Sequence, residues 1–348
     1  MIENLDARGI ENSVFVPTYD RKLSAIRPNS NVLICECFKK WDRVLFDYKQ
    51  RKIFNALESN FKIPDYDLIH AYTLFTDGNC ARRMARKYGK PYVVAVRNTD
   101  VNDFFRLMPH LRKRGVQIMR DAAAVFFLSE SYRDQVFSKY VPPKYQEALS
   151  AKTYIVPNGI DDFWFANEQA PKIVLDGTVK LIFAGRIDRN KNIQTTQKAM
   201  EILRNRGVAV TLTVVGRVAD QRLLNKIKND PYTKFVSAMP KEELITLYRN
   251  HDIFVMPSYT ESFGLVYAEA MSQGLPVIYS KGQGFDNQFP EGIVGYHVDA
   301  HDAVDVADGI ENAINHFDSI QQNVVELSKR FNWTDITAVY ARIYKELT

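Results

Sequence analysis

The amino-acid sequence predicts an α/β protein in which two domains each contain a doubly wound parallel sheet. Apolar segments of strand length alternate with helix-like segments along the whole chain, and strands separated by helices are typical of parallel sheets. The 348 residues are also enough for two domains of ordinary size. The predicted strands form two series, at residues 13–17, 31–38, 67–72, 91–96, 123–128 and 153–157, and at residues 179–185, 210–216, 234–239, 252–257, 275–280 and 294–298.

A turn-rich segment, VPNGIDDFWF at residues 156–165, separates the two series. Its Pro, Asn-Gly and Asp residues interrupt the apolar pattern, so we expect a first domain over residues 1–157 and a second over residues 158–330. Residues 331–348 repeat aromatic and aliphatic side chains at helical spacing and predict a terminal helix. No GxGxxG motif follows a strand, which disfavours a dinucleotide-dependent oxidoreductase.

The composition indicates a cytoplasmic protein. Hydrophobic residues make up 46% and charged residues 25% of the chain, as in soluble globular proteins. No apolar run approaches the ~20 residues needed to cross a bilayer, and the polar N-terminus does not resemble a signal peptide. Three cysteines without a disulfide or zinc pattern indicate reduced thiols.

Positive charge is concentrated in the first half of the chain. Residues 1–160 contain 26 Lys and Arg against 17 Asp and Glu, a net charge of +9, whereas the whole chain carries +5. Basic clusters at residues 82–87 and 112–114 suit an anionic membrane surface or a phosphate-bearing acceptor; solvated helix faces are the ordinary alternative. Nucleic acid is not expected, because no basic motif has interleaved aromatic residues.

Residues 256–273, MPSYTESFGLVYAEAMSQ, are the most informative stretch. They follow an apolar strand and predict a loop and then a helix that begins near Gly264. A helix start offers unpaired N–H groups and a partial positive charge, which suit a phosphate. Glu261 and Glu269 are carboxylates that accept hydrogen bonds from hydroxyls, so the ligand that fits both features is a sugar nucleotide. The alternative is a capping box formed by Ser258 and Glu261 before an ordinary helix.

Two cations follow the predicted strand at residues 179–185. Arg186 and Lys191 lie in the segment GRIDRNKN, where a planar guanidinium and a mobile ammonium would suit a diphosphate. They would also stabilise the charge that develops on a leaving diphosphate. Ordinary basic residues at a strand end are the alternative.

The segment PSYTESFGLVYAEAMSQGLPVI, with its Glu-x7-Glu spacing, resembles the signature of the retaining glycosyltransferases of family 4. VPNGID and the Gly-Arg-x4-Lys pattern at residues 185–191 are similar to two further family segments. The resemblance implies the GT-B fold, in which two Rossmann-like domains face a cleft and the C-terminal helix crosses back to the first domain. It also implies transfer of a hexose-type sugar from a nucleotide-diphosphate sugar to a saccharide or lipid-linked acceptor, in polysaccharide or glycoconjugate synthesis, without a metal ion or other cofactor.

The resemblance also assigns the donor side of the site. Glu261 would bind hydroxyls of the donor sugar, Glu269 the ribose, and the backbone amides around Gly264 phosphate or sugar. A glycine of the family pattern is replaced here by Asn192. The full donor-binding set is Gly185, Arg186, Lys191, Gly216, Val236, Glu261, Phe263, Gly264, Leu265 and Glu269, with Gly216 and Val236 at the nucleobase.

The acceptor side is predicted from two segments of the first domain. His70 and Tyr72 lie where many relatives have His-x-His, with Tyr72 in place of the second histidine; a histidine in the core at a strand end is the alternative. Arg97, Asn98 and Asp100 resemble a family segment that faces the cleft. Asp100 is an acceptor-binding or proton-accepting candidate, and a helix N-cap is its alternative.

The beginning of the chain differs from the family pattern. Relatives have a strand, a glycine-rich loop and a long helix before a segment like LDARGIENSVFVP, which starts here at residue 5. We therefore expect the first domain to lack its first strand, which keeps open a second function, that of a non-catalytic sugar-nucleotide-binding subunit. The Glu-x7-Glu context speaks against an epimerase or a phosphorylase. The sequence does not specify the sugar, the base, the acceptor, the linkage or the oligomeric state.

Overall fold

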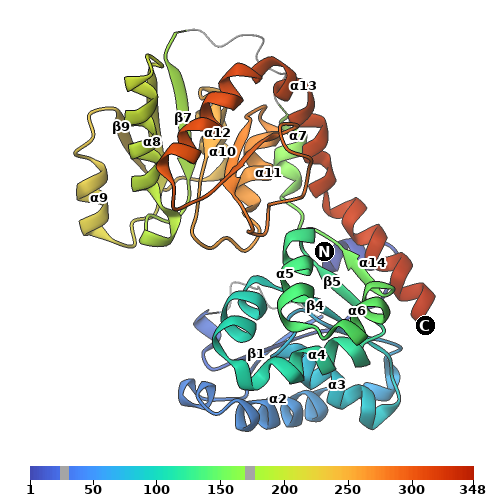
Figure 1. Cartoon of the computed structure of the whole chain (residues 1–348). Coiled ribbons are helices and arrows are strands. Elements are labelled where there is room, and N and C mark those ends of the chain that lie inside the picture. The colour runs from blue at the N-terminus through green and yellow to red at the C-terminus, as the bar shows by residue number, and fades with distance from the viewer. Residues whose placement is uncertain (24–30, 169–176) are drawn as a thin grey trace. The chain divides into compact units, whose positions relative to one another are not determined.

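The computed structural model describes residues 1–23, 31–168 and 177–348, and its contacts divide the chain into two compact units (Figure 1). Unit 1 comprises Met1–Leu128, Gln135–Val156 and Thr337–Thr348, and unit 2 comprises Ser129–Asp134 and Pro157–Ile336. Both units contain a parallel sheet, and helices separate most of the successive strands. The predicted fold class, an α/β protein with two Rossmann-like domains, is confirmed.

Unit 1 has a four-stranded parallel sheet in the order β3-β4-β5-β6 and a separate parallel pair, β1-β2. The strands are β1 (Val14–Thr18), β2 (Val32–Glu36), β3 (Ile69–Ala71), β4 (Tyr92–Val96), β5 (Ala124–Phe127) and β6 (Thr153–Ile155). The helices are α1 (Ile2–Asp6), α2 (Phe46–Asn60), α3 (Asp77–Tyr88), α4 (Arg112–Asp121), α5 (Glu130–Tyr140), α6 (Pro143–Ser150) and a π-helical turn, η4 (Asp100–Phe105).

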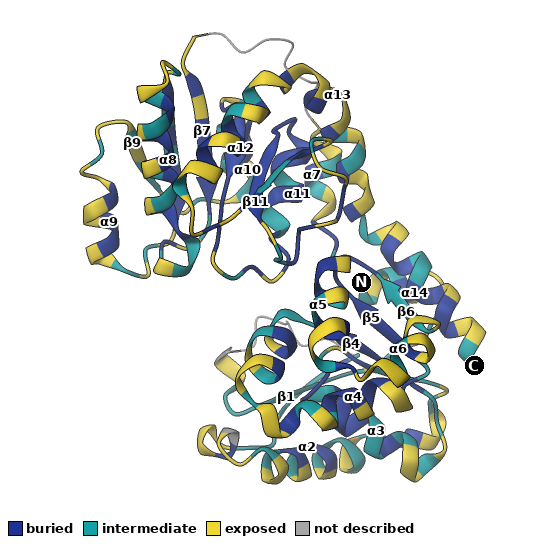
Figure 2. Cartoon of the chain, viewed as in Figure 1, coloured by how far each residue is buried: buried dark blue, intermediate teal, exposed yellow. Residues whose placement is uncertain are grey.

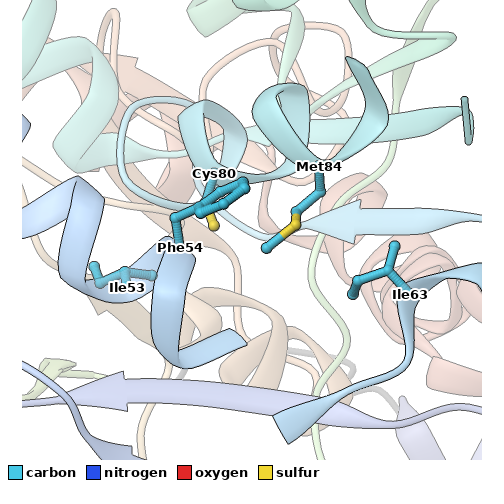
Figure 3. Packing of buried hydrophobic residues seen from close by; sticks show 5 residues of the cluster. All are labelled: Ile53, Phe54, Ile63, Cys80 and Met84. Atoms are coloured by element: carbon cyan, nitrogen blue, oxygen red, sulfur yellow. The ribbon is translucent and has the colours of Figure 1, made fainter. Parts of the chain in front are cut away.

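The core of unit 1 lies between this sheet and its helices. Every residue of β4 and β5 is buried, as expected for parallel strands covered on both faces (Figure 2). Helices α2, α3 and α4 lie side by side (Figure 1). Between α2 and α3 a smaller apolar cluster packs together, made of Ile53, Phe54, Ile63, Cys80 and Met84 (Figure 3). Burial raises the pKa of the Cys80 thiol to about 12, so this cysteine behaves as an apolar core residue.

Unit 2 has a six-stranded parallel sheet in the order β12-β11-β10-β7-β8-β9. The strands are β7 (Val179–Ala184), β8 (Val210–Gly216), β9 (Thr233–Ser237), β10 (Ile253–Val255), β11 (Val277–Ser280) and β12 (Gly295–Val298). The helices are α7 (Asp162–Ala166), α8 (Ile193–Asn205), α9 (Gln221–Ile227), α10 (Lys241–Arg249), α11 (Leu265–Ser272), α12 (Ala303–Asn315), α13 (Phe317–Ser328) and α14 (Trp333–Leu347), the last of which continues into unit 1.

The order of the central strands positions the candidate site. The chain crosses from β9 back to β10, which lies on the other side of β7 from β8. Ligands of such sheets collect at the carboxyl ends of strands, next to the point where the strand order reverses. The loops that follow β7, β8 and β10 therefore meet at one edge. Among the described residues, no helix combines the length and the apolar character that a bilayer span requires.

Candidate active site

The loops after β7 and β8 approach each other closely. Gly216 ends β8 with a φ of 155°, and a Cβ added there would lie 1.7 Å from the carbonyl oxygen of Gly185. No other residue type fits that approach without moving the backbone. Val236 lies on the next strand, paired with Val215 of β8. The donor residues predicted at these strand ends therefore share one edge of unit 2.

Helix α11 begins where the sequence predicts it. Gly264 caps the helix in the left-handed conformation, with a φ of 73°, and a Cβ there would lie 2.3 Å from the ring of Tyr267. The capping-box alternative is wrong, because Ser258 and Glu261 both lie in the loop before the helix. The Ser258 hydroxyl instead donates to the Glu261 carboxylate, at 3.4 Å.

Lys191 and Glu261, which the sequence predicts separately, form an ion pair. The Lys191 Nζ donates to Glu261 Oε2 at 2.5 Å, and the two side chains are only 17% and 9% exposed. The other carboxylate oxygen, Oε1, accepts the backbone N–H of Ser262 at 3.0 Å. A cation and a carboxylate are thus held together, mostly away from water, immediately before the start of α11.

Asn190 links the two donor loops and was not predicted from the sequence. Its side-chain amide donates to the carbonyl of Thr260 at 2.7 Å, and its side-chain oxygen accepts the Thr260 N–H at 3.0 Å. Its backbone carbonyl accepts the N–H of Tyr259 at 2.9 Å. In the sequence Asn190 stands out only because it directly precedes Lys191, and that position does not indicate that its side chain bonds to the loop of Thr260.

Asn192, the departure from the family pattern, has a left-handed backbone conformation of the kind that glycine adopts readily. It has a φ of 55°, which asparagine adopts more readily than most residues. Its buried amide donates to the carbonyls of Pro257 and Ala300, at 2.9 and 2.6 Å. These two hydrogen bonds connect the loop of Lys191 to the segments that contain Pro257 and Ala300.

Arg186 is more exposed than Lys191. Its side chain is 58% exposed, and its Nε donates to Asp188 at 2.5 Å. Asp188 also accepts the backbone N–H of Lys191 at 3.1 Å. Asp188 thus contacts the side chain of Arg186 and the backbone of Lys191, and Arg186 stays exposed.

The three remaining predicted residues of the Glu-x7-Glu segment lie in different surroundings. Glu269 is half-buried on α11. Its burial, together with the carboxylate of Asp161, raises its pKa to about 7, although Lys241 acts in the opposite direction. Phe263 is 2% exposed and its ring packs on Phe331, so its backbone amide is the part that remains for a ligand. Leu265 is the first residue of the helix.

The acceptor-side residues lie in unit 1. The ring of His70 stacks on Tyr72 at 4.4 Å, and its Nδ1 lies 2.5 Å from the hydroxyl of Tyr344. Burial, with a smaller effect of the Arg97 charge, lowers the pKa of His70 to about 3. The imidazole is therefore neutral at physiological pH, in keeping with a core histidine at a strand end.

Asp100 is a fully buried carboxylate with three backbone donors. It accepts the N–H groups of Leu74 at 2.9 Å, Phe75 at 3.1 Å and Arg97 at 2.9 Å. Burial raises its pKa to about 6, while these hydrogen bonds act in the opposite direction. The N-cap of the following helix is Thr99, so Asp100 instead holds the loop after β3. Beside it, Asn98 accepts a hydrogen bond from Asn102.

Two family models match the chain, one over each half. A model described as "Glycosyltransferase Family 4" matches residues 1–162, and one described as "Glycosyl transferases group 1" matches residues 166–329.

Two similar proteins match most of the chain. A D-inositol 3-phosphate glycosyltransferase of Paenarthrobacter aurescens is 27% identical over 307 residues, which are 81% of this chain and 73% of the relative. A protein of the same name from Pseudarthrobacter chlorophenolicus is 29% identical over 265 residues, or 71% of this chain and 62% of the relative. This chain therefore spans about two thirds of their length.

Solved structures share the fold at low identity. A sucrose-phosphate synthase from Thermosynechococcus elongatus superposes with a TM-score of 0.76 at 20% identity, covering 99% of this chain and 91% of that one. The HepE protein of Anabaena in complex with UDP has a TM-score of 0.70 at 16% identity and covers 97% of this chain and 100% of its own.

Proposed function

The chain belongs to the retaining glycosyltransferases of family 4, and we propose that it moves a hexose from a uridine diphosphate sugar to a saccharide or lipid-linked acceptor. Two similar folds have been solved in complex with a uridine nucleotide, one with UDP and UDP-glucose and the other with UDP-2-fluoro glucose, which is why uridine is the first base to test. The comparisons do not favour the alternative of a non-catalytic subunit.

The observation that carries this proposal is the contact between Lys191 and Glu261 beside the start of α11. Each group alone has an ordinary explanation, but together they offer the three partners that a sugar nucleotide needs. Lys191 offers charge to a phosphate, Glu261 accepts hydrogen bonds from sugar hydroxyls, and the N–H groups of α11 face an anion. When a sugar nucleotide binds, its contacts with Lys191 and Glu261 would replace the direct ion pair between these two residues.

We propose a division of labour in the reaction. Lys191 and Arg186 stabilise the negative charge that grows on the leaving diphosphate as the bond from the anomeric carbon to its oxygen breaks. The acceptor hydroxyl forms the new bond on the same face and passes its proton to a phosphate oxygen. His70 is neutral and Asp100 is engaged with three amides, so neither is required as the base.

The first test measures donor binding and turnover. A thermal melt against UDP-, GDP-, ADP- and TDP-sugars should show an increased midpoint with one base, since a ligand that binds the folded state stabilises it. Lys191→Ala and Glu261→Ala should each lower turnover by about 100-fold or more, as the loss of a charged partner of the transition state does. Arg189→Ala is the matched control, because that arginine lies in the same loop and is 91% exposed. Turnover at the wild-type rate in both site variants would refute the donor-site assignment.

We also propose that transfer needs no metal ion, since Arg186 and Lys191 supply positive charge to the diphosphate. Turnover should then persist in EDTA. Loss of turnover in EDTA, restored by Mg²⁺ or Mn²⁺, would contradict this.

Finally, we propose that unit 1 contacts an anionic membrane at its periphery, where a lipid-linked acceptor would lie. Its support is a group of exposed apolar residues beside the exposed Lys39 and Lys40. This apolar patch consists of Trp41, Val44, Leu45 and Tyr48, whose side chains are 83, 78, 63 and 46% exposed. Apolar side chains that insert at the interface and cations that attract anionic headgroups are the two ingredients of such contacts.

A further inference from the structure

A basic pocket of about 460 Å³ lies among α2, α3 and α4 of unit 1, far along the chain from the donor residues of unit 2. The three helices lie side by side (Figure 1). All the lining residues come from the first two turns of these helices: Asp47, Gln50 and Arg51 of α2, Asn79, Arg82 and Arg83 of α3, and Arg114 and Gln117 of α4.

The charge of this pocket is strongly positive. Four arginines line it against one carboxylate, that of Asp47. The helices start at the same side, so their N-terminal partial charges add to the field of the guanidinium groups. A cavity with this lining favours an anion, and one that carries more than one negative charge.

Two buried donors point to a ligand independently of the charge. Gln50 is 1% exposed, and its side-chain oxygen accepts a hydrogen bond from Asn79 at 3.0 Å. Its Nε2 has no partner among the described residues, and neither has the Nη2 of Arg82. Buried donors without partners are costly, so native proteins rarely leave them unpaired.

The guanidinium groups themselves differ in how free they are. Arg82 forms an ion pair with Asp121 at 2.6 Å. Arg83 lies over the ring of Phe54, 4.1 Å from the ring centroid, and Phe54 is a member of the apolar cluster in Figure 3. Arg114 pairs with Asp47 at 2.5 Å. Arg51 has neither an ion pair nor a hydrogen bond within the described part of the chain. Within the described residues Arg51 is thus free to contact a ligand. The other three arginines are held by contacts that leave some of their N–H groups available to a ligand.

We propose that this pocket binds the phosphate groups of a ligand, at a site separate from the donor site. Planar guanidinium forks match the oxygens of a phosphate, and four of them suit a phosphate ester or a diphosphate better than a single carboxylate. In this arrangement Asp47 opposes the ligand, because its charge repels the anion and occupies Arg114. The proposal does not depend on the function proposed above.

The test measures binding of inorganic pyrophosphate by isothermal titration calorimetry, in the full chain carrying Arg186→Gln and Lys191→Gln. That background removes the two donor-site cations, so that the heat reports on the pocket of unit 1. We expect saturable binding that weakens at high salt. The absence of binding at millimolar pyrophosphate would overturn the proposal.

Two substitutions in this background should act in opposite directions. Arg51→Gln should weaken binding by about tenfold, which is the value of one charge-assisted contact. Asp47→Asn should strengthen it by several-fold. Lys113→Gln is the matched control, since this exposed lysine of α4 carries the same charge and does not line the pocket. Equal affinities in the Arg51 variant and its parent, or weaker binding after Asp47→Asn, would overturn the proposal.

Competition then identifies the source of the phosphate. Glycerol 3-phosphate and a short-chain phosphatidic acid are each added to the bound pyrophosphate complex. Stronger displacement by the lipid assigns the pocket to a headgroup, and equal or stronger displacement by the soluble ester assigns it to a free metabolite; both results support a phosphate site. Failure of both to displace pyrophosphate would contradict it.

Discussion

Asn192 shows how one side chain can replace a family glycine and add a function that glycine lacks. Its positive φ continues the chain from the Lys191 loop into α8, and its amide ties that loop to Pro257 and Ala300. These hydrogen bonds are buried, so their loss leaves unpaired carbonyl oxygens.

Substitutions at Asn192 should separate the backbone effect from the side-chain effect. Asn192→Gly keeps the positive φ and should lower the free energy of unfolding by about 1–2 kcal/mol, the value of the lost hydrogen bonds. Asn192→Ala should cost about 1 kcal/mol more, because alanine is strained at a φ of 55°. Urea titration measures both. Asn287, with a φ of 60°, is the control: Asn287→Gly should be close to neutral, and an equal loss at both positions would contradict the role of the Asn192 amide.

Glu269 should make stability depend on pH in a defined direction. Its pKa is raised from 4.5 to about 7 in the folded chain, so the folded state disfavours its ionised form. The resulting destabilisation is absent below pH 4.5, grows as the pH rises and is complete above pH 7. Glu269→Gln should therefore stabilise the protein by about 1–2 kcal/mol at pH 8 and hardly at pH 5, a range that allows for screening of a half-buried group. Urea titrations at both pH values decide this, and an equal gain at both would show that packing, not charge, is responsible.

At the residue scale the sequence predicts the groups with distinctive chemistry and misses those that hold them. Lys191 and Glu261 are identifiable because a cation or a carboxylate at a strand end suggests a ligand. Asn190 and Tyr132 are not. The Tyr132 hydroxyl donates to the backbone carbonyl of Glu261 from 129 positions away along the chain, and no local pattern encodes a contact at that distance.

At the scale of elements, α11 depends on the glycine before it. Gly264→Ala should disturb the start of the helix, because the new Cβ would meet the Tyr267 ring, whose hydroxyl donates to the carbonyl of Met256. We expect a loss of about 2–4 kcal/mol in the free energy of unfolding and weaker donor binding, by the combined effects of φ strain and overpacking.

Gly282→Ala is the matched control for this prediction. Gly282 has the same φ of 73°, but nothing lies within 4 Å of an added Cβ. It should therefore show only the backbone strain, about 1 kcal/mol. Chemical denaturation and a nucleotide-sugar titration compare the two variants. Equal losses would mean that the Tyr267 contact adjusts without cost.

The existence of the strands follows from the sequence, and their ends do not. All twelve predicted strands are present, but the segment predicted at residues 252–257 is extended only over Ile253–Val255. The prediction was too long because a hydrophobic pattern indicates burial and not strand pairing, and Met256 is as buried as the residues of the strand before it. Pro257 has no N–H for a ladder, and the Met256–Pro257 carbonyls bond to side chains of Tyr267 and Asn192. The site therefore begins where burial continues but strand pairing stops.

At the scale of the whole molecule, the alternation of strands and helices predicts two sheets but not which short segments join which unit. Ser129–Asp134 belongs to unit 2 although the chain on both sides belongs to unit 1. Hydrogen bonds between residues far apart in the sequence join such segments to unit 2. The Tyr132 hydroxyl donates to the carbonyl of Glu261, and the Arg330 guanidinium donates to the carbonyl of Gln288. The sequence does show one property at this scale, which is that positive charge is concentrated in the first half of the chain.

That charge and the apolar patch together predict binding to anionic vesicles. The full chain should sediment with vesicles that contain phosphatidylglycerol and not with pure phosphatidylcholine, and about 0.5 M salt should release it, because salt screens the attraction of lysines to headgroups. Trp41→Ser with Leu45→Ser should weaken binding by about tenfold, since it removes two side chains that would enter the interface. Val304→Ser, at a residue of unit 2 that is 48% exposed, should leave binding unchanged. Binding that is equal in the double variant and its parent would show that the patch does not meet a membrane, and binding that is equal for both lipids would show that the lysines of unit 1 do not attract anionic headgroups.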